Sequence, residues 1–435
     1  MLNVSRQLFA SQVLICLLLA PKLHAAEIPV TEAWVVTTSA GEKYSSQYLN
    51  VTGTHWLLGR GESIRRFSPQ QVLSVMHQHP LSLQVPFKSV AGRVCRLTLS
   101  NGDSLTGQLV DFSETDLTFL PAVLAWDGQD NRDAPVKPLE VMLESVAQLE
   151  WSAPDGGFSK RESLKPAGEN ELQQDQLVLS NGDRILGELS DFSPTALKLE
   201  TDAGAREILI QELSQLRFNP ELVIKPTKQA ERTLVRLGDG SQVTANSINL
   251  VEYNVLLLNT VLAGSWQVPL DSVDSLVSLT ESRKPLSERV PDEVTYTPFL
   301  STVPPWQIDA NVLGRPMRMQ SAGYLTGLGM HPRTELTWSL EEDDQKFLAE
   351  LGIDDITSGA GSVTFEVLTD GNSVYQSDII RGGDRAELIQ IDLSGKKSLT
   401  LRVDFGDRGD VQDRANWGHA LILNSQKSPE PSKSE

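Results

Sequence analysis

The stretch that decides the fold begins GLGMHPRTELTWSL at Gly327 and ends DRANWGHALIL at Leu423, in a chain of 435 residues. Between these ends Val363, Phe365 and Val367 alternate with polar positions, and the turn sequence DGN follows them. Two further runs before Leu423 alternate in the same way, and no long helical pattern interrupts them. Period-two alternation with tight turns predicts an antiparallel sandwich of two sheets.

The chain from Tyr296 to Asn424, about 130 residues, resembles the NPCBM/NEW2 family in the words YLTGLGMHPRTELTWSL, FLAELGIDD, VTFEVLTDGNSVYQS and DRANWGHALIL. This family is the carbohydrate-binding module found beside family 98 glycosyl hydrolases. The resemblance covers the C-terminal domain only. It implies a galactose-binding-like jelly roll, which agrees with the strand alternation, and it implies a glycan as the ligand.

A sugar site needs a flat apolar face for the ring CH groups and planar polar groups for the hydroxyls. Trp417, just before the last strand, is expected to be the stacking surface or, alternatively, a buried structural tryptophan. His331 occupies a motif position of the resembled family, where its alternative role is a loop-fixing hydrogen bond. Arg385 offers bidentate hydrogen bonds, Asp355 binds hydroxyls or fixes a turn, and Asn416 stands beside Trp417.

The run DFGDRGDVQDR spaces aspartates three residues apart. Oxygen-rich loops of this kind hold Ca²⁺, although the spacing is not that of an EF-hand. The superfamily that the resemblance implies often carries a structural calcium. Asp407, Asp410 and Asp413 are therefore candidate calcium ligands, with an ordinary solvated acidic loop as the alternative. No other cofactor is expected.

Before this domain the sequence repeats itself. LTLSNGDSLTGQLVDFSETDLTFL starts at Leu97 and LVLSNGDRILGELSDFSPTALKLE at Leu177, with a looser copy at Leu234 and a faint one at Trp34. Their turn glycines lie about 60 to 80 residues apart, a period typical of small repeated modules. Each copy alternates as about five short antiparallel strands do, which predicts a small SH3-like or Sm-like barrel. The fold class expected is thus all-β, with repeated barrel units followed by a jelly-roll sandwich.

These patterns set the expected domain boundaries. They are a signal peptide at 1–26, a degenerate β repeat at 27–90, barrel-like repeats at 91–152, 171–225 and 226–282, linkers at 153–170 and 283–295, the jelly roll at 296–425 and a disordered tail at 426–435. The N-terminus has a positive region, a short apolar core and small residues at Ala25 and Ala26. This is typical of an export signal, so a periplasmic or extracellular location is expected.

The net charge of −19 and the acidic turns argue against nucleic acid as a partner, and no apolar run is long enough for membrane insertion. After signal removal Cys95 is the only cysteine, which excludes an intramolecular disulfide. No GxSxG, HExxH, P-loop or GxGxxG motif occurs, and the repeats leave no room for a (β/α)₈ barrel. The chain is therefore not expected to be an enzyme.

The sequence favours an exported, non-catalytic carbohydrate-binding protein whose repeats act as a scaffold or bind other proteins. One alternative is a structural or adhesive protein of the periplasm or cell surface that does not bind sugar. Another is a glycoside hydrolase whose site carries no recognisable motif.

Overall fold

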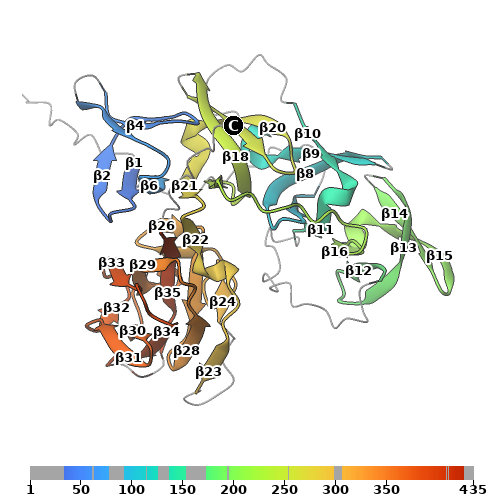
Figure 1. The fold of residues 1–435 in the computed structure, drawn as a ribbon. Helices are drawn as coiled ribbons and strands as arrows, with labels where there is room; N and C mark the ends of the chain where they lie inside the picture. Colours follow the sequence, from blue (N-terminus) through green and yellow to red (C-terminus); the bar gives the residue numbers. More distant parts are fainter. Residues whose placement is uncertain are drawn as a thin grey trace, which may run out of the picture. The chain divides into compact units, whose positions relative to one another are not determined.

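The computed structural model describes residues 34–60, 63–77, 93–113, 115–125, 137–152, 173–193, 195–252, 254–297, 306–407, 409 and 411–425 (Figure 1). The expected signal peptide, the linker 153–170 and the tail 426–435 lie outside these residues. The described chain is nearly all β-structure, which confirms the predicted fold class. No helix in the described part of the chain is long and apolar enough to cross a membrane.

Three consecutive units share one plan of five antiparallel strands, with a 3₁₀ turn before the fifth. The strands are β7 (Cys95–Leu99), β8 (Ser104–Phe112), β9 (Asp116–Pro121), β10 (Leu139–Met142) and β11 (Val146–Trp151); β12 (Asp175–Leu179), β13 (Arg184–Phe192), β14 (Ala196–Thr201), β15 (Gly204–Leu209) and β16 (Leu213–Arg217); β17 (Arg232–Leu237), β18 (Gln242–Glu252), β19 (Val255–Thr260), β20 (Ser265–Pro269) and β21 (Val273–Leu279). The short helices are α1 (Ala122–Ala125), η2 (Leu143–Ser145), η3 (Ile210–Glu212) and η4 (Leu270–Ser272).

In each unit the first strand pairs with both the second and the fifth, as β12 pairs with β13 and β16, so the strands are paired in the order fifth–first–second–third–fourth. The long second strand bends at a register shift, between Leu189 and Asp191 in β13, and so passes from one side of the barrel to the other. The turn glycine Gly182 has φ +93°, as a tight hairpin turn between β12 and β13 requires. These features confirm the SH3-like barrels.

The first unit is a less regular version of the same plan. Its strands are β1 (Trp34–Thr38), β2 (Lys43–Ser46), β3 (Leu49–Val51), β4 (Trp56–Leu58), β5 (Arg65–Phe67) and β6 (Val72–His77). β1 again pairs with both the next strand and the last, whereas β3, β4 and β5 form a small sheet of their own.

The units join through their last strands. β11 pairs antiparallel with β16, with Leu149 opposite Leu216, and β6 pairs antiparallel with β21, with Val75 opposite Leu276. Each joint places two last strands edge to edge, so the open edges of these barrels are covered rather than exposed.

The C-terminal domain is a sandwich of two antiparallel sheets. One has the order β24–β27–β35–β29–β33 with β22 also paired to β35, and the other has the order β23–β28–β34–β30–β31 with β32 also paired to β30. The bounds are β22 (Arg283–Pro285), η5 (Leu286–Glu288), β23 (Glu293–Tyr296), β24 (Gln307–Ile308), β25 (Met317–Met319), β26 (Ala322–Tyr324), β27 (Gly327–Met330), β28 (Thr334–Ser339), β29 (Asp344–Ile353), η6 (Asp355–Thr357), β30 (Ser362–Thr369), β31 (Asn372–Gln376), β32 (Ile380–Arg381), β33 (Glu387–Asp392), β34 (Ser398–Phe405) and β35 (Ala415–Asn424).

The interpretation of residues 283–295 as a linker is wrong. Arg283 pairs with Leu423 in β22, and Glu293 pairs with Thr337 in β23, so this segment supplies one strand to each sheet of the sandwich. The ladder hydrogen bonds of these strands come from residues far along the chain, which a local reading of Pro and charge content does not detect.

Two clusters of buried apolar side chains stabilise the sandwich, one inside it and one against the repeats. Its interior includes Trp338, Phe365 and Trp417, all fully buried. A second cluster packs Leu348 and Leu421 of the sandwich against residues of the first and fourth repeat units, Leu73, Val277 and Leu279. The outer face of the sheet that contains β29 and β35 is therefore covered by the repeats.

Candidate functional site

Strand pairing brings the predicted site residues to one end of the sandwich. Ala415, the first residue of β35, pairs with both Met330 and Ile353, the last residues of β27 and β29. Val363 near the start of β30 pairs with Phe405 at the end of β34. The loops 331–333, 354–361 and 382–386, together with residues 406–407 and 411–414, consequently gather at this end, which we call the loop end.

Trp417 is not the exposed stacking surface considered in the sequence analysis. It is fully buried, with its ring edge-on to Phe365 at a centroid distance of 5.0 Å. A sugar cannot reach a tryptophan face inside the core, so the alternative interpretation, a structural tryptophan, describes this residue.

Asn416 is likewise buried and does not offer its amide to a ligand at the surface. Its Nδ2 donates to Asp354 at 2.8 Å, and Nδ2 of Asn311 donates to the same carboxylate at 3.0 Å. The backbone N–H groups of Ile356 and Arg318 complete four hydrogen bonds to Asp354, which is 2% exposed. Asp354 therefore holds three loop-end segments together, and the word GIDD is the sequence signal for this network.

Asp355 is exposed and fixes the tight turn between β25 and β26. Its carboxylate accepts hydrogen bonds from the N–H groups of Gln320 and Ser321 at 2.8 and 2.6 Å. Both of these residues have positive φ, 50° and 67°, so the turn needs this anchor. Nε2 of Gln320 in turn donates to the carbonyl of Gly383, which ties Asp355 to the loop that carries Arg385.

Arg385 is exposed, and no partner of its guanidinium occurs in the described structure. Its five donors face solvent, as recognition of hydroxyls or carboxylates requires. His331 differs, because it is half-buried and already engaged within the protein. Of the five residues predicted to bind sugar, Arg385 and Asp355 thus lie at the surface of the loop end.

The three candidate calcium ligands do not form a described site. Asp407 is paired with Arg381 at 2.7 Å, and this hydrogen bond lowers the pKa of Asp407. Asp413 is buried and accepts the N–H of Ser362 at 2.7 Å. Asp410 lies outside the described residues. Calcium at this loop therefore stays a prediction.

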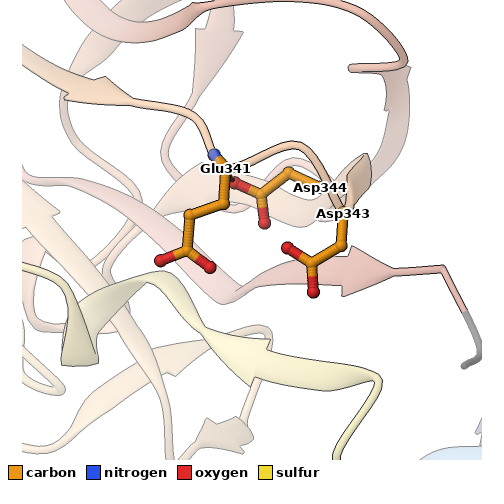
Figure 2. Close-up of side chains that lie close together, drawn as sticks. All are labelled: Glu341, Asp343 and Asp344. Atoms are coloured by element: carbon orange, nitrogen blue, oxygen red, sulfur yellow. Dashed lines mark hydrogen bonds between the residues drawn. The ribbon is translucent and has the colours of Figure 1, made fainter.

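Figure 2 shows the one acidic cluster with metal-like spacing among the described residues, formed by Glu341, Asp343 and Asp344. Asp344 is buried, and both of its oxygens accept hydrogen bonds from Arg289, at 2.6 and 2.7 Å. The guanidinium already neutralises the best-placed carboxylate, so this cluster is explained without an ion.

Two antiparallel sheets around one core, with loops gathered at one end, define the C-terminal domain as a jelly-roll sandwich. Residues 288–423 match the NPCBM/NEW2 domain family. This match confirms the resemblance stated from the sequence, for the C-terminal domain only.

A CBM51 module of Clostridium perfringens GH95, solved with methyl-galactose, is 24% identical and covers 32% of this chain and 99% of its own, with a TM-score of 0.30. The CBM51-2 and INT domains of Clostridium perfringens ZmpB, solved with GlcNAc, are 20% identical and cover 42% of this chain and 44% of their own, also with a TM-score of 0.30.

A Renibacterium salmoninarum protein, provisionally named as an endo-alpha-N-acetylgalactosaminidase, is 29% identical over 172 residues, 37% of this chain. The chain spans only 11% of that protein's length. The jelly-roll assignment itself rests on the strand order of this chain.

Proposed function

We propose that this protein binds a glycan at the loop end of its C-terminal sandwich, without catalysing a reaction, after export from the cytoplasm. The observation that carries the proposal is the NPCBM/NEW2 match over residues 288–423, the part of the chain that forms the loop end. Arg385 supports it, because an exposed guanidinium that has no partner among the described residues is available to donate hydrogen bonds to vicinal hydroxyls. Export is inferred from the signal-like segment 1–26, and the repeats serve as a scaffold or contact other proteins.

The test is a glycan array probed with the mature full-length protein, with and without Ca²⁺, followed by titration of the best ligand and of methyl-galactose. We expect Arg385→Ala to weaken binding about tenfold or more, since a hydrogen bond to a charged group contributes roughly 1.5–3 kcal/mol. Arg206→Ala is the matched control, because Arg206 is also exposed but lies on β15 in a repeat. Absence of binding to every glycan would refute the proposal.

A structural or adhesive role is the second candidate, and the burial of Trp417 favours it. Because Trp417 is buried, the predicted position offers no exposed aromatic ring on which a sugar could stack. In that case the wild-type protein would bind no glycan but would associate with cell-envelope components through its repeats. Hydrolysis of a polysaccharide panel by the same preparation would contradict the non-catalytic part of the proposal.

A further inference from the structure

A cavity of about 560 Å³ lies where the fourth repeat unit meets the loop end. The repeat contributes Arg236 and Asp274 to its lining, and the sandwich contributes Arg315, Arg318 and Asp355. This volume lies within the range of about 300–1,000 Å³ that is usual for small-ligand sites. The repeats, which lie outside the family match, thus form one wall of a hollow at the proposed glycan-binding end.

Asp274 is the most unusual group in this wall. It is 4% exposed, yet its Oδ2 receives no hydrogen bond within the described structure. Nε of Arg236 and Nη2 of Arg318 lie 3.8 Å from the two carboxylate oxygens, which is too far for a hydrogen bond. Burial raises the pKa of Asp274, and the charges of Arg318 and Arg236 partly offset this effect. A buried carboxylate oxygen that accepts no hydrogen bond lowers the stability of the protein. A ligand that donates a hydrogen bond to this oxygen is therefore expected to bind favourably.

The other repeats do not carry this charged pair. Arg236 pairs with Ser275 across β17 and β21, as Thr98 pairs with Gln148 and Val178 with Gln215 in the two preceding units. Thr98 and Val178 are therefore the equivalents of Arg236. The residue that precedes Ser275 in this unit is Asp274. The residues that precede Gln148 and Gln215 in the other two units are Ala147 and Ser214. The barrel fold consequently does not require a carboxylate or a guanidinium here, and the pair occurs in the unit that faces the cavity.

The mixed charge of the lining favours a particular ligand class. A carboxylate such as Asp274 accepts hydrogen bonds, whereas Arg315, exposed and without a described partner, and Arg318 donate them. An acidic ligand would meet Asp274 and Asp355, and a basic one would meet the arginines. Hydroxyl groups both donate and accept, so a neutral sugar unit satisfies both kinds of group.

We propose that the fourth repeat and the sandwich form a composite site for a neutral sugar unit, in which Asp274 accepts hydroxyl hydrogen bonds and Arg315 donates them. This inference rests on the proposed glycan binding and adds that the repeat takes part in it. Asp274 and Arg315 determine specificity in this site, and the repeats are therefore more than a spacer.

The test compares the affinity of full-length variants for methyl glycosides of neutral hexoses and for glucuronic acid. Asp274→Ser installs the side chain that the third unit has at this position, and we expect it to weaken binding about tenfold or more. Arg315→Ala, an exposed change that leaves the repeat untouched, is expected to weaken binding several-fold. The control is Asp271→Ser, which removes an exposed carboxylate three residues away and outside the cavity lining.

Thermal unfolding of each variant shows whether a loss of affinity reflects a loss of fold, and Arg315→Ala decides the matter if Asp274→Ser is unstable. Wild-type affinity in both variants would overturn the composite site while leaving the proposed function intact. Tighter binding of glucuronic acid than of neutral hexosides would overturn the ligand class. Failure of the wild-type protein to bind any glycan would overturn both proposals together.

Discussion

His419 occupies a β-bulge in β35, with φ of 47°, and its imidazole is completely buried. The register of β35 against β29 shifts between Leu348 and Glu350, opposite this bulge. Because of the extra residue, Trp417 and Ala420 both face the sandwich interior although they are three positions apart. Strict alternation counted back from Ala420 places Trp417 on the other face, which is why the sequence did not decide between a buried and an exposed tryptophan.

The pKa of His419 provides a residue-scale prediction. Burial lowers this pKa from 6.5 to about 4, an effect that the nearby Glu350 opposes and Lys43 reinforces. The folded protein therefore keeps a neutral imidazole where the unfolded chain gains a proton. The free energy of unfolding therefore carries no penalty from His419 at pH values above the pKa that this histidine has in the unfolded chain. It falls as the pH drops from about 6.5 toward 4. This single group should remove about 2 kcal/mol of unfolding free energy between pH 7 and pH 5.

His419→Asn tests this sign, since asparagine tolerates positive φ and does not titrate. Urea denaturation at both pH values should show a smaller acid-induced loss in the variant than in the wild type. All other titrating groups are shared, so the difference between the two proteins isolates the histidine. Equal losses would mean that His419 is protonated in the folded state as well.

At the scale of the element, two glycines of one barrel make a matched pair. Gly182 sits in the β12–β13 turn with φ +93° and open space around its Cα. Gly187 sits within β13, where an added Cβ would lie 2.4 Å from the carbonyl oxygen of Glu200 on β14. We expect Gly182→Ala to cost about 1 kcal/mol through its backbone conformation alone. Gly187→Ala should cost more, because the added methyl forces the paired strands β13 and β14 apart. The expected cost is that of overpacking, roughly 1–3 kcal/mol or above.

Chemical denaturation of both variants, read at the transition of the repeats, measures the two costs. The order is the decisive result: a Gly182→Ala variant less stable than Gly187→Ala would show that turn conformation, and not close packing of the strands, limits this barrel.

The repeats were predictable as elements because their signals are local. LSNGD with alternating leucines specifies a hairpin, and both β12 and β13 lie where the pattern puts them. β22 was not predictable, since it has three residues, RKP, and pairs with residues near Leu421, far along the chain. The candidate site residues also divide into those that local sequence predicts and those that tertiary packing places. The surface positions of Asp355 and Arg385 agree with local loop signals, whereas Asp274 enters the cavity only through tertiary packing.

For the whole molecule, Arg283 is the joint between the repeats and the sandwich. Its backbone pairs with β35, while its buried guanidinium donates to the carbonyls of Val72, Ser278 and Gln70. Burial lowers the pKa of Arg283 to about 10, yet the group stays charged at neutral pH. One side chain therefore satisfies carbonyls from the first and fourth units and holds them against the sandwich strand that precedes η5.

Arg283→Met keeps an unbranched apolar stem and removes the guanidinium donors, which leaves buried carbonyls unsatisfied at roughly 1–3 kcal/mol each. We expect faster hydrogen exchange in both β6 and β35, two segments that do not pair with each other, because the lost guanidinium served both. Lys284→Met, an exposed neighbour on the same strand, should leave exchange unchanged. If exchange in Arg283→Met rose in β35 alone, the guanidinium would be stabilising only the sandwich, and the apolar cluster of Leu73, Leu348 and Leu421 would have to be the main connection between the two parts.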